Sequence, residues 1–289
     1  MIFLLLVLSN VVLAVIFKFF EKFRIDNLNA IVVNYFTCVV SSSIFMGHQS
    51  VPSDFYAKPW FGSSILLSLL FIVGFNLMAL SFQKAGLALT AIIQKMSLLL
   101  SAGFAIIFYN EVLTTYKFIG FVAAVVTIIL VNYPSNGQKI ELKNRWLILL
   151  PLIVFLLSGL IEILLFYVEV SGQVDGDGMY FTATSFGLAG CIGSLIVLIR
   201  VLTGRSTFGL KDFIGGIILG LPNYLSIYLL VYLLANNWEG SVLFPLNNVS
   251  ILLMVTFIGA LFYKEKLDFF KVLGMGFGII AIVLIGSGL

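Results

Sequence analysis

Charged residues are scarce in this sequence, and their scarcity argues against a soluble protein. Only 10% of the 289 residues are Asp, Glu, Lys or Arg, against about 25% in an ordinary soluble domain. Hydrophobic residues make up 61% of the chain, and a soluble domain of this length has too little interior to bury them. A cytosolic enzyme, a disordered chain and a secreted disulfide scaffold are therefore excluded, and lipid is expected to surround most of the protein.

Histidine and cysteine are also rare, which limits the chemistry that the chain can perform. His48 is the only histidine, so a site of several histidines is excluded. Cys38 and Cys191 lie in apolar runs far apart in the sequence, and we interpret them as small buried hydrophobic residues. The nucleotide-binding motif GxxxxGK[ST] does not occur, which excludes drive by ATP within this chain. We expect no cofactor, no metal, no catalytic residues and no nucleic-acid partner.

Ten apolar runs indicate ten membrane-spanning helices. A helix needs about 20 apolar residues, within a range of about 17–25, to cross the hydrocarbon core of a bilayer. The linkers are short, so residues 1–289 are expected to form a single transmembrane domain. The runs lie roughly at 2–20, 28–46, 60–82, 87–108, 117–132, 146–168, 179–200, 212–234, 241–262 and 270–287.

The basic residues predict the orientation of these helices. Thirteen of the 16 Lys and Arg residues lie in the linkers after the first, third, fifth, seventh and ninth runs. The other linkers carry only Lys58 and Lys117, and Lys95 lies inside a run. Loops rich in Lys and Arg remain cytoplasmic. Both termini are therefore expected to be extracytoplasmic, in what we expect to be a bacterial inner (plasma) membrane.

Two segments of the chain repeat each other. FYNEVLTTYKFIG (108–120) aligns with FYKEKLDFFKVLG (262–274) at a constant offset of 154 residues. Five runs in each repeat is an odd number, so the second repeat enters the membrane from the opposite side, as in many secondary transporters. The predicted repeats are 1–133 and 144–289. The matched residues are Phe108, Tyr109, Glu111, Leu113, Lys117 and Gly120 with Phe262, Tyr263, Glu265, Leu267, Lys271 and Gly274.

Ten helices in two such halves resemble the EamA-like branch of the drug/metabolite transporter superfamily. The end of each half carries the resemblance: an aromatic residue, Glu111 or Glu265, and then a helix that begins near Gly120 or Gly274. One feature differs, because the proline usual near the middle of the helix before each Glu is missing, and Pro245 lies earlier. The resemblance implies an all-α transporter whose substrate binds near the membrane midplane, between two halves that rock around it.

Two ionisable residues lie inside runs, where each costs roughly 2.5–3.5 kcal/mol even on the lenient insertion scale. Lys95 is about eight residues into the fourth run, roughly 12 Å from its cytoplasmic end. It either extends to the interface or, as we predict, lines a cavity and binds an anionic substrate group. Glu162 is predicted to bind substrate or a coupling proton, unless it lies near the outer interface. The two differ in depth by about 12 Å, too far for a direct ion pair. Two long side chains, a helix tilt or a zwitterionic substrate between them could close this gap.

Amide side chains complete the predicted binding site. Asn247 and Asn248 follow Pro245, which removes a helix hydrogen bond. At the repeat offset Gln94 corresponds to Asn248, so symmetry-related helices carry polar groups at matching depths. A matched, interrupted pair of helices is typical of transporter sites. The remaining amides, which either line the cavity or join neighbouring helices, are Asn10, Asn34, Asn76 and Asn223.

Other residues are interpreted as structural. Glu111 and Glu265 lie at helix ends, and each is predicted to cap the N-terminus of the next helix, where the helix dipole favours a carboxylate. The spacings Ser97/Ser101, Gly216/Gly220 and Gly274/Gly278 indicate close helix packing.

These features predict a secondary transporter that moves a small polar metabolite by alternating access. The solute is amino-acid-like or otherwise anionic or zwitterionic, and protons are a candidate coupling ion. A lipid-linked sugar flippase of the same superfamily remains an alternative. An intramembrane transferase, a further alternative, needs convergent acid–base groups, which one loop histidine and scattered acids do not supply. A permanent channel fits an inverted repeat with lone buried charges less well.

Overall fold

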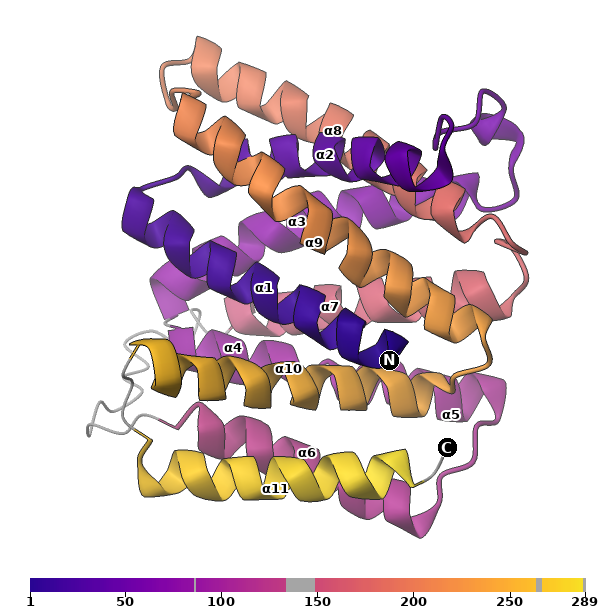
Figure 1. The fold of residues 1–289 in the computed structure, drawn as a ribbon, viewed down its shortest axis with the longest axis vertical. Helices are drawn as coiled ribbons and strands as arrows, with labels where there is room; N and C mark the ends of the chain where they lie inside the picture. The colour runs from indigo at the N-terminus through magenta and orange to yellow at the C-terminus, as the bar shows by residue number, and fades with distance from the viewer. Residues whose placement is uncertain (86, 134–148, 264–266, 288–289) are drawn as a thin grey trace. The chain divides into compact units, whose positions relative to one another are not determined.

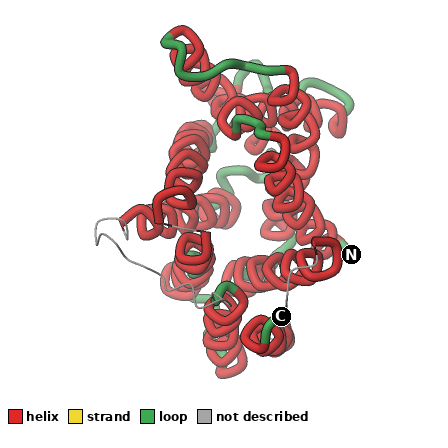
Figure 2. The backbone as a smooth tube through the Cα atoms, turned by 90° about the vertical axis from the view of Figure 1, so that its left-hand side faces the viewer, coloured by secondary structure: helices red, strands yellow, loops and turns green. Residues whose placement is uncertain are grey.

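The computed structural model describes residues 1–289 apart from 86, 134–148, 264–266 and 288–289. This part of the chain consists of helices joined by loops, without strands (Figures 1 and 2). Eight of its helical segments are long and apolar enough to cross a membrane. The shorter apolar segments Ile2–Phe17 and Thr115–Val131 bring the spans among the described residues to ten. The predicted fold class, an all-α polytopic membrane protein with ten membrane-spanning segments, is confirmed.

The helices agree with the predicted runs to within a few residues at each end. The fourth span consists of two helices, α4 and α5, and one short 3-10 helix, η1 (Phe55–Ala57), precedes α3. The α-helices are α1 (Ile2–Phe23), α2 (Asn27–Met46), α3 (Phe61–Ala85), α4 (Leu87–Lys95), α5 (Leu98–Tyr109), α6 (Thr115–Val131), α7 (Leu149–Val170), α8 (Gly178–Leu202), α9 (Leu210–Ala235), α10 (Gly240–Tyr263) and α11 (Phe269–Gly286).

The break between α4 and α5 directly follows Lys95. The amide of Ser97 donates to the carbonyl of Gln94 at 3.0 Å, and that of Leu100 donates to Ser97 at 2.9 Å. These bonds reach back three residues instead of four, so a tight turn separates the two helices. The expectation of an interruption near Pro245 was wrong, because α10 is continuous there. Pro245 lies early in α10, where its missing amide leaves only one carbonyl of the first turn without a helical donor.

The chain forms two compact units, and each unit takes helices from both sequence repeats. Unit 1 contains Met1–Ile72 and Tyr167–Ala235, and unit 2 contains Val73–Phe166 and Asn236–Leu289. Helices α3 and α7 contribute residues to both units. Units 1 and 2 are therefore packing units, distinct from the sequence repeats.

In unit 1 the glycines of α9 bring that helix close to α2. A Cβ atom at Gly216 would lie 2.5 Å from the carbonyl oxygen of Ala30, and one at Gly220 would lie 2.4 Å from Cβ of Thr37. Such close contacts need glycine at both positions. Because later residues of α9 contact later residues of α2, these helices run in the same direction, as the second and eighth spans of an alternating chain must.

In unit 2 helices α6 and α11 make the same contact twice (Figure 1). A Cβ at Gly120 would lie 2.5 Å from Ile285, and a Cβ at Gly274 would lie 2.9 Å from Val131. The two contacts are related by the offset of 154 residues. The start of each helix meets the end of the other, so the helices are antiparallel. This arrangement is the local two-fold symmetry of an inverted repeat.

The N-termini of these two helices are capped at equivalent positions. Thr114 accepts a hydrogen bond from the amide of Lys117 at 3.2 Å, and Asp268 accepts one from the amide of Lys271 at 2.8 Å. Each cap satisfies one of the amides that a helix N-terminus leaves unpaired. The first residue of each pair is again 154 positions from its counterpart.

Glu111 caps a different helix from the one predicted. Its two carboxylate oxygens accept hydrogen bonds from the amides of Gly240 and Ser241, both at 2.8 Å, at the start of α10. The prediction that it caps the next helix, α6, was wrong, because Thr114 already fills that position. Glu265 lies outside the described residues.

Candidate functional site

Three polar residues from separate helices of unit 2 meet in one hydrogen-bonded cluster. The Lys95 ammonium, at the end of α4, donates to Oδ1 of Asn248 on α10 at 3.1 Å. The Asn248 Nδ2 donates to Oε1 of Glu162 on α7 at 2.9 Å. Asn248 therefore joins a cation and a carboxylate through the two ends of its amide. We call these three residues the Lys95–Asn248–Glu162 cluster.

Ser101 on α5 completes the coordination of Glu162. Its hydroxyl donates to Oε2 of Glu162 at 2.7 Å, so both carboxylate oxygens accept a hydrogen bond. The sequence placed Ser101 among residues for close helix packing and missed this contact. Close packing is nevertheless present beside it, because a Cβ at Gly159 of α7 would lie 2.6 Å from Leu100. Only the helix pairing, which the sequence does not show, directs Ser101 toward Glu162.

The neutral members of this site are buried, whereas the charged ones are partly accessible. Ser101 is 1% and Asn248 6% exposed, while Lys95 and Glu162 are intermediate. Charges withdrawn from water need well-placed hydrogen bonds to compensate for lost hydration. Asn248 and Ser101 supply these bonds, and Lys95 and Glu162 each keep part of their surface exposed.

The end of α4 adds a further electrostatic feature. The carbonyls at a helix C-terminus carry partial negative charge, which favours a nearby cation. Lys95 is the last residue of α4, so its own ammonium or a cationic group of a ligand is favoured at this position. A broken helix whose ends face polar groups is also the arrangement by which many transporters hold their substrates.

The other predicted residues of unit 2 are Gln94, Asn247 and Asn76, and they lie outside the hydrogen bonds of the cluster. Gln94 Nε2 donates to the Met78 sulfur at 3.3 Å. Asn247 is 8% exposed, and its Oδ1 is buried without a hydrogen-bond partner. Buried acceptors are nearly always paired, and this oxygen is an exception among the residues that the structure describes. Asn76 of α3 is exposed.

Three predicted residues, Asn10, Asn34 and Asn223, belong to unit 1 instead. Asn223 of α9 donates to Oδ1 of Asn34 on α2 at 3.1 Å, which joins two helices of the same unit. Asn10 donates to the carbonyl of Leu6 in its own helix at 2.9 Å. In the described structure these contacts serve helix packing and helix structure.

The cysteines differ in environment. Cys38 is buried, and its sulfur donates to the carbonyl of Gly220 at 3.3 Å. The prediction that Cys191 is buried was wrong: it is exposed, because its side of α8 is left uncovered by neighbouring residues. In the described part of the chain no group of three or more His, Cys, Asp or Glu residues could hold a metal ion.

Comparisons with known proteins agree with this architecture. A protein of Haemophilus influenzae described as uncharacterized is 29% identical over 289 residues, which cover 96% of this chain and 94% of the relative. A solved crystal structure with a TM-score of 0.72 covers 99% of this chain and 93% of its own, at 13% identity, and thus shows likeness of fold alone. Residues 1–133 match the model of the EamA-like transporter family. The resemblance noted in the sequence is thereby confirmed over residues 1–133, which are similar to the EamA-like transporter family of the drug/metabolite transporter superfamily.

Proposed function

We propose that this chain is a secondary transporter of small zwitterionic solutes of the amino-acid type, which bind at the Lys95–Asn248–Glu162 cluster. The family match supports the general activity, since it indicates a membrane transporter of the drug/metabolite superfamily. The single observation that carries the substrate class is the placement of opposite charges on the two ends of one amide.

The size of this arrangement suits an α-amino acid. The Asn248 amide spans the space between an ammonium donor at 3.1 Å and a carboxylate acceptor at 2.9 Å. A free amino acid carries a carboxylate and an ammonium at a comparable separation. Its carboxylate would pair with Lys95 and its ammonium with Glu162, and the cluster would remain electrically neutral. Neutrality matters because an uncompensated charge in this environment is strongly destabilising.

Transport by alternating access requires that the occupied site open to one side of the membrane at a time. The break after Lys95 supplies a local point of adjustment within the fourth span, as in transporters with discontinuous helices. Glu162 is the proposed site of a coupling proton, because it is the carboxylate of the cluster. A proton on Glu162 would alter its hydrogen bonds to both Asn248 and Ser101.

A ligand screen on the purified chain tests the substrate class. Amino acids, primary amines of matched side chain and matched carboxylic acids are compared by the shift that each causes in thermal unfolding. We expect only the zwitterions to stabilise the protein. Stabilisation by lipid-linked sugars alone would favour the flippase alternative and would contradict the proposal.

Variants of the cluster locate the binding site. Lys95→Ala is expected to weaken zwitterion binding at least about tenfold, or about 1.4 kcal/mol. Lys95→Arg is not expected to restore it, because a planar guanidinium fills a pocket differently from an ammonium. Asn223→Ala, which removes a polar pair of unit 1, is the matched control and should change affinity less than about twofold.

The proposed orientation places both termini outside the cytoplasm of a bacterial plasma membrane. Both lysines of the predicted outer linkers are paired with acids: Lys58 lies 3.3 Å from Asp177, and the buried Lys117 contacts Glu239. The asymmetry of the basic residues supports this orientation, because Lys and Arg in the loops determine it and acidic residues contribute little. A reporter fused after Leu289 that is active only in the cytoplasm should remain inactive, and strong activity would reverse the orientation.

A further inference from the structure

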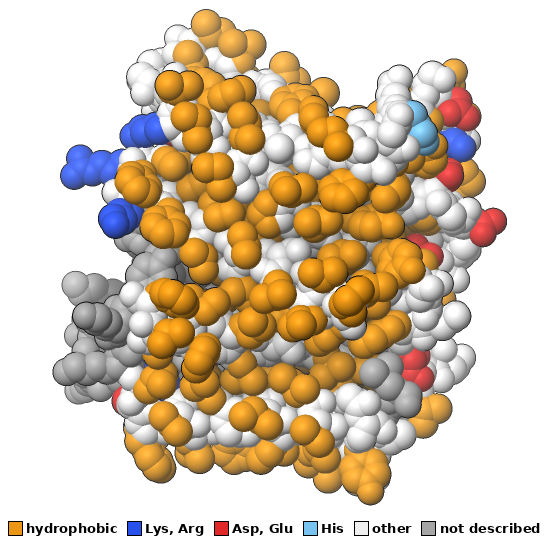
Figure 3. Space-filling view, viewed as in Figure 1, with side chains coloured by type: hydrophobic (Ala, Val, Ile, Leu, Met, Phe, Trp, Pro, Cys, Tyr) orange, Lys and Arg blue, Asp and Glu red, His pale blue; other side chains and the backbone are white. Residues whose placement is uncertain are grey.

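One end of unit 1 carries a group of exposed basic residues. It lies where α1 ends, α2 begins, α8 ends and α9 begins. In Figure 3 the Lys and Arg side chains along the left edge of the upper part belong to this region. Its exposed members, which we call the basic patch, are Lys22, Arg24, Arg205 and Lys211.

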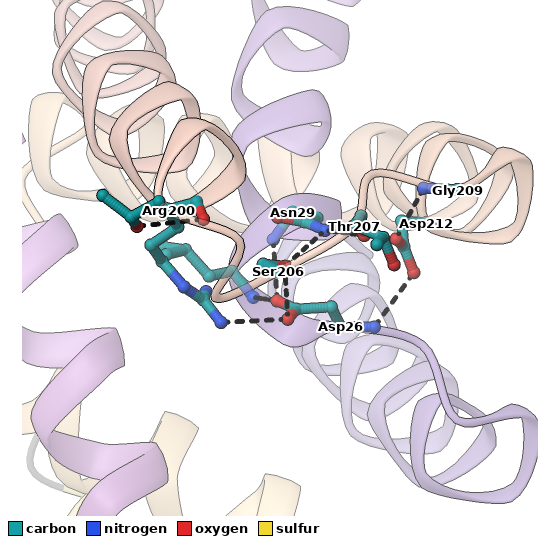
Figure 4. Close-up of polar contacts among 9 residues, drawn as sticks. Asp26, Asn29, Arg200, Ser206, Thr207, Gly209 and Asp212 are labelled. Carbon is teal, nitrogen blue, oxygen red and sulfur yellow. Dashed lines mark hydrogen bonds and ion pairs between the residues drawn. The ribbon is translucent and has the colours of Figure 1, made fainter.

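Two acidic residues beside the patch, Asp26 and Asp212, are engaged in a separate network (Figure 4). Asp26 caps α2 by accepting from the amides of Leu28 at 3.0 Å and Asn29 at 3.2 Å, and it also pairs with Arg200 at 3.2 Å. This network joins the α1–α2 loop to the α8–α9 loop. Asp26 is therefore occupied by hydrogen-bond donors of the protein itself.

Asp212 is occupied in the same way and is almost fully buried. It is 2% exposed and accepts from the amides of Asp26 and Gly209, each at 3.0 Å, and from Asn29 Nδ2 at 3.2 Å. Asp212 also attracts the Lys211 ammonium and offsets part of the charge of that lysine. Lys22, Arg24 and Arg205 are exposed cations outside this interaction.

The backbone holds two of the cations together. Lys211 donates from its ammonium to the carbonyl oxygen of Arg24. Arg24 itself has a φ of 52°, in the left-handed region. It follows the last residue of α1, a position where glycine is usual because other side chains are strained there. An arginine kept in this conformation suggests that its side chain has a function.

Apolar side chains surround the patch on the same loops. Phe23 is 58%, Phe208 47% and Leu210 74% exposed. The Lys22 ammonium lies 5.9 Å from the centre of the Phe23 ring. Aromatic and basic residues at the end of a membrane-spanning helix lie at the depth of the lipid headgroups. The surroundings therefore place the patch against lipid instead of bulk water.

We propose that the basic patch binds the headgroup of an anionic phospholipid. Clusters of Lys and Arg beside the ends of membrane helices attract anionic lipids, with about 1 kcal/mol for each basic residue near the surface. Arg24 and Lys211, which are joined through the Arg24 carbonyl oxygen, supply two such charges, and the exposed apolar side chains supply a surface for the acyl chains. This proposal does not depend on the transported substrate.

Lipid titration of the purified full-length chain in neutral detergent tests the proposal. Phosphatidylglycerol is compared with phosphatidylcholine of the same acyl chains, and the shift in thermal unfolding gives an apparent affinity. We expect phosphatidylglycerol to bind more tightly. Arg24→Gly and Arg205→Gln should each weaken that binding about fivefold. Arg24→Gly also relieves the left-handed strain, so stability without lipid is not expected to fall.

A control variant and a soluble anion make the result decisive. Lys84 is exposed and lies in unit 2, so Lys84→Gln removes the same charge outside the patch and should leave lipid affinity unchanged. Equal weakening by Lys84→Gln, or none by Arg24→Gly and Arg205→Gln, would overturn the proposal. Soluble glycerol phosphate should cause no shift at the same concentration, and a shift equal to that of the lipid would overturn the assignment to a phospholipid.

Discussion

The two units bury polar side chains in different ways. In unit 1 the neutral amides of Asn34 and Asn223 join each other across α2 and α9. In unit 2 the Lys95–Asn248–Glu162 cluster buries an amide between two charges. An interhelical amide bond contributes about 0.6 kcal/mol on average to a membrane protein. Lys95 and Glu162 are partly withdrawn from water, and opposite charges withdrawn from water often contribute less to stability than apolar residues of similar size. Helix packing therefore explains the Asn34–Asn223 pair, whereas the Lys95–Asn248–Glu162 cluster points to a function.

The largest difference between the two units is expected when the polar residues of each are replaced with apolar residues. The triple variant Lys95→Met, Asn248→Leu, Glu162→Leu is expected to abolish transport while leaving stability equal or higher by about 1–4 kcal/mol. The double variant Asn34→Leu, Asn223→Leu should lower stability by less than about 2 kcal/mol and retain substrate affinity. Reconstituted uptake and unfolding of both proteins provide the measurement. Retained uptake in the triple variant would remove the cluster from the mechanism.

A second prediction separates the two acids of α7. Glu162→Gln should flatten the pH dependence of uptake, because glutamine cannot exchange a proton and Glu162 is the carboxylate of the cluster. Glu169→Gln, seven residues further along the same helix and in unit 1, should leave the profile unchanged. Uptake measured across a pH series decides between these outcomes. An unchanged profile in Glu162→Gln would exclude it as the coupling site.

The smallest expected effect is a loss of stability when the Glu111 cap of α10 in unit 2 is removed. Glu111→Ala removes the carboxylate that caps α10, and it should lower stability by about 1–2 kcal/mol. Substrate affinity should remain close to that of the wild type, which distinguishes a capping carboxylate from a binding one. A tenfold loss of affinity at unchanged stability would assign Glu111 to the site instead.

Much of the fold was predictable because lipid imposes a simple pattern. Each span must be apolar over about 20 residues, so ten runs gave the ten helices to within a few residues. The offset of 154 residues likewise predicted equivalent positions, and Gly120 and Gly274 indeed make equivalent contacts. These features depend on local sequence or on internal comparison alone.

The site was less predictable because it depends on which helices pair. Depth counted along straight helices separated Lys95 from Glu162, whereas the structure links both to Asn248. Such contacts depend on how each helix tilts and on which helices pack against it. The sequence of a single helix determines neither of these. The same limitation explains why Glu111 was assigned to the wrong helix and why Ser101 was missed.

Selectivity for a zwitterion over its decarboxylated amine tests the central claim most directly. The affinity ratio is measured for an amino acid retained by the screen and its matched amine, with the wild type and Lys95→Ala. If Lys95 binds the carboxylate, the wild type should prefer the amino acid at least about tenfold, and Lys95→Ala should lose that preference. A variant that keeps the full preference would contradict the account, because the carboxylate would then be recognised elsewhere.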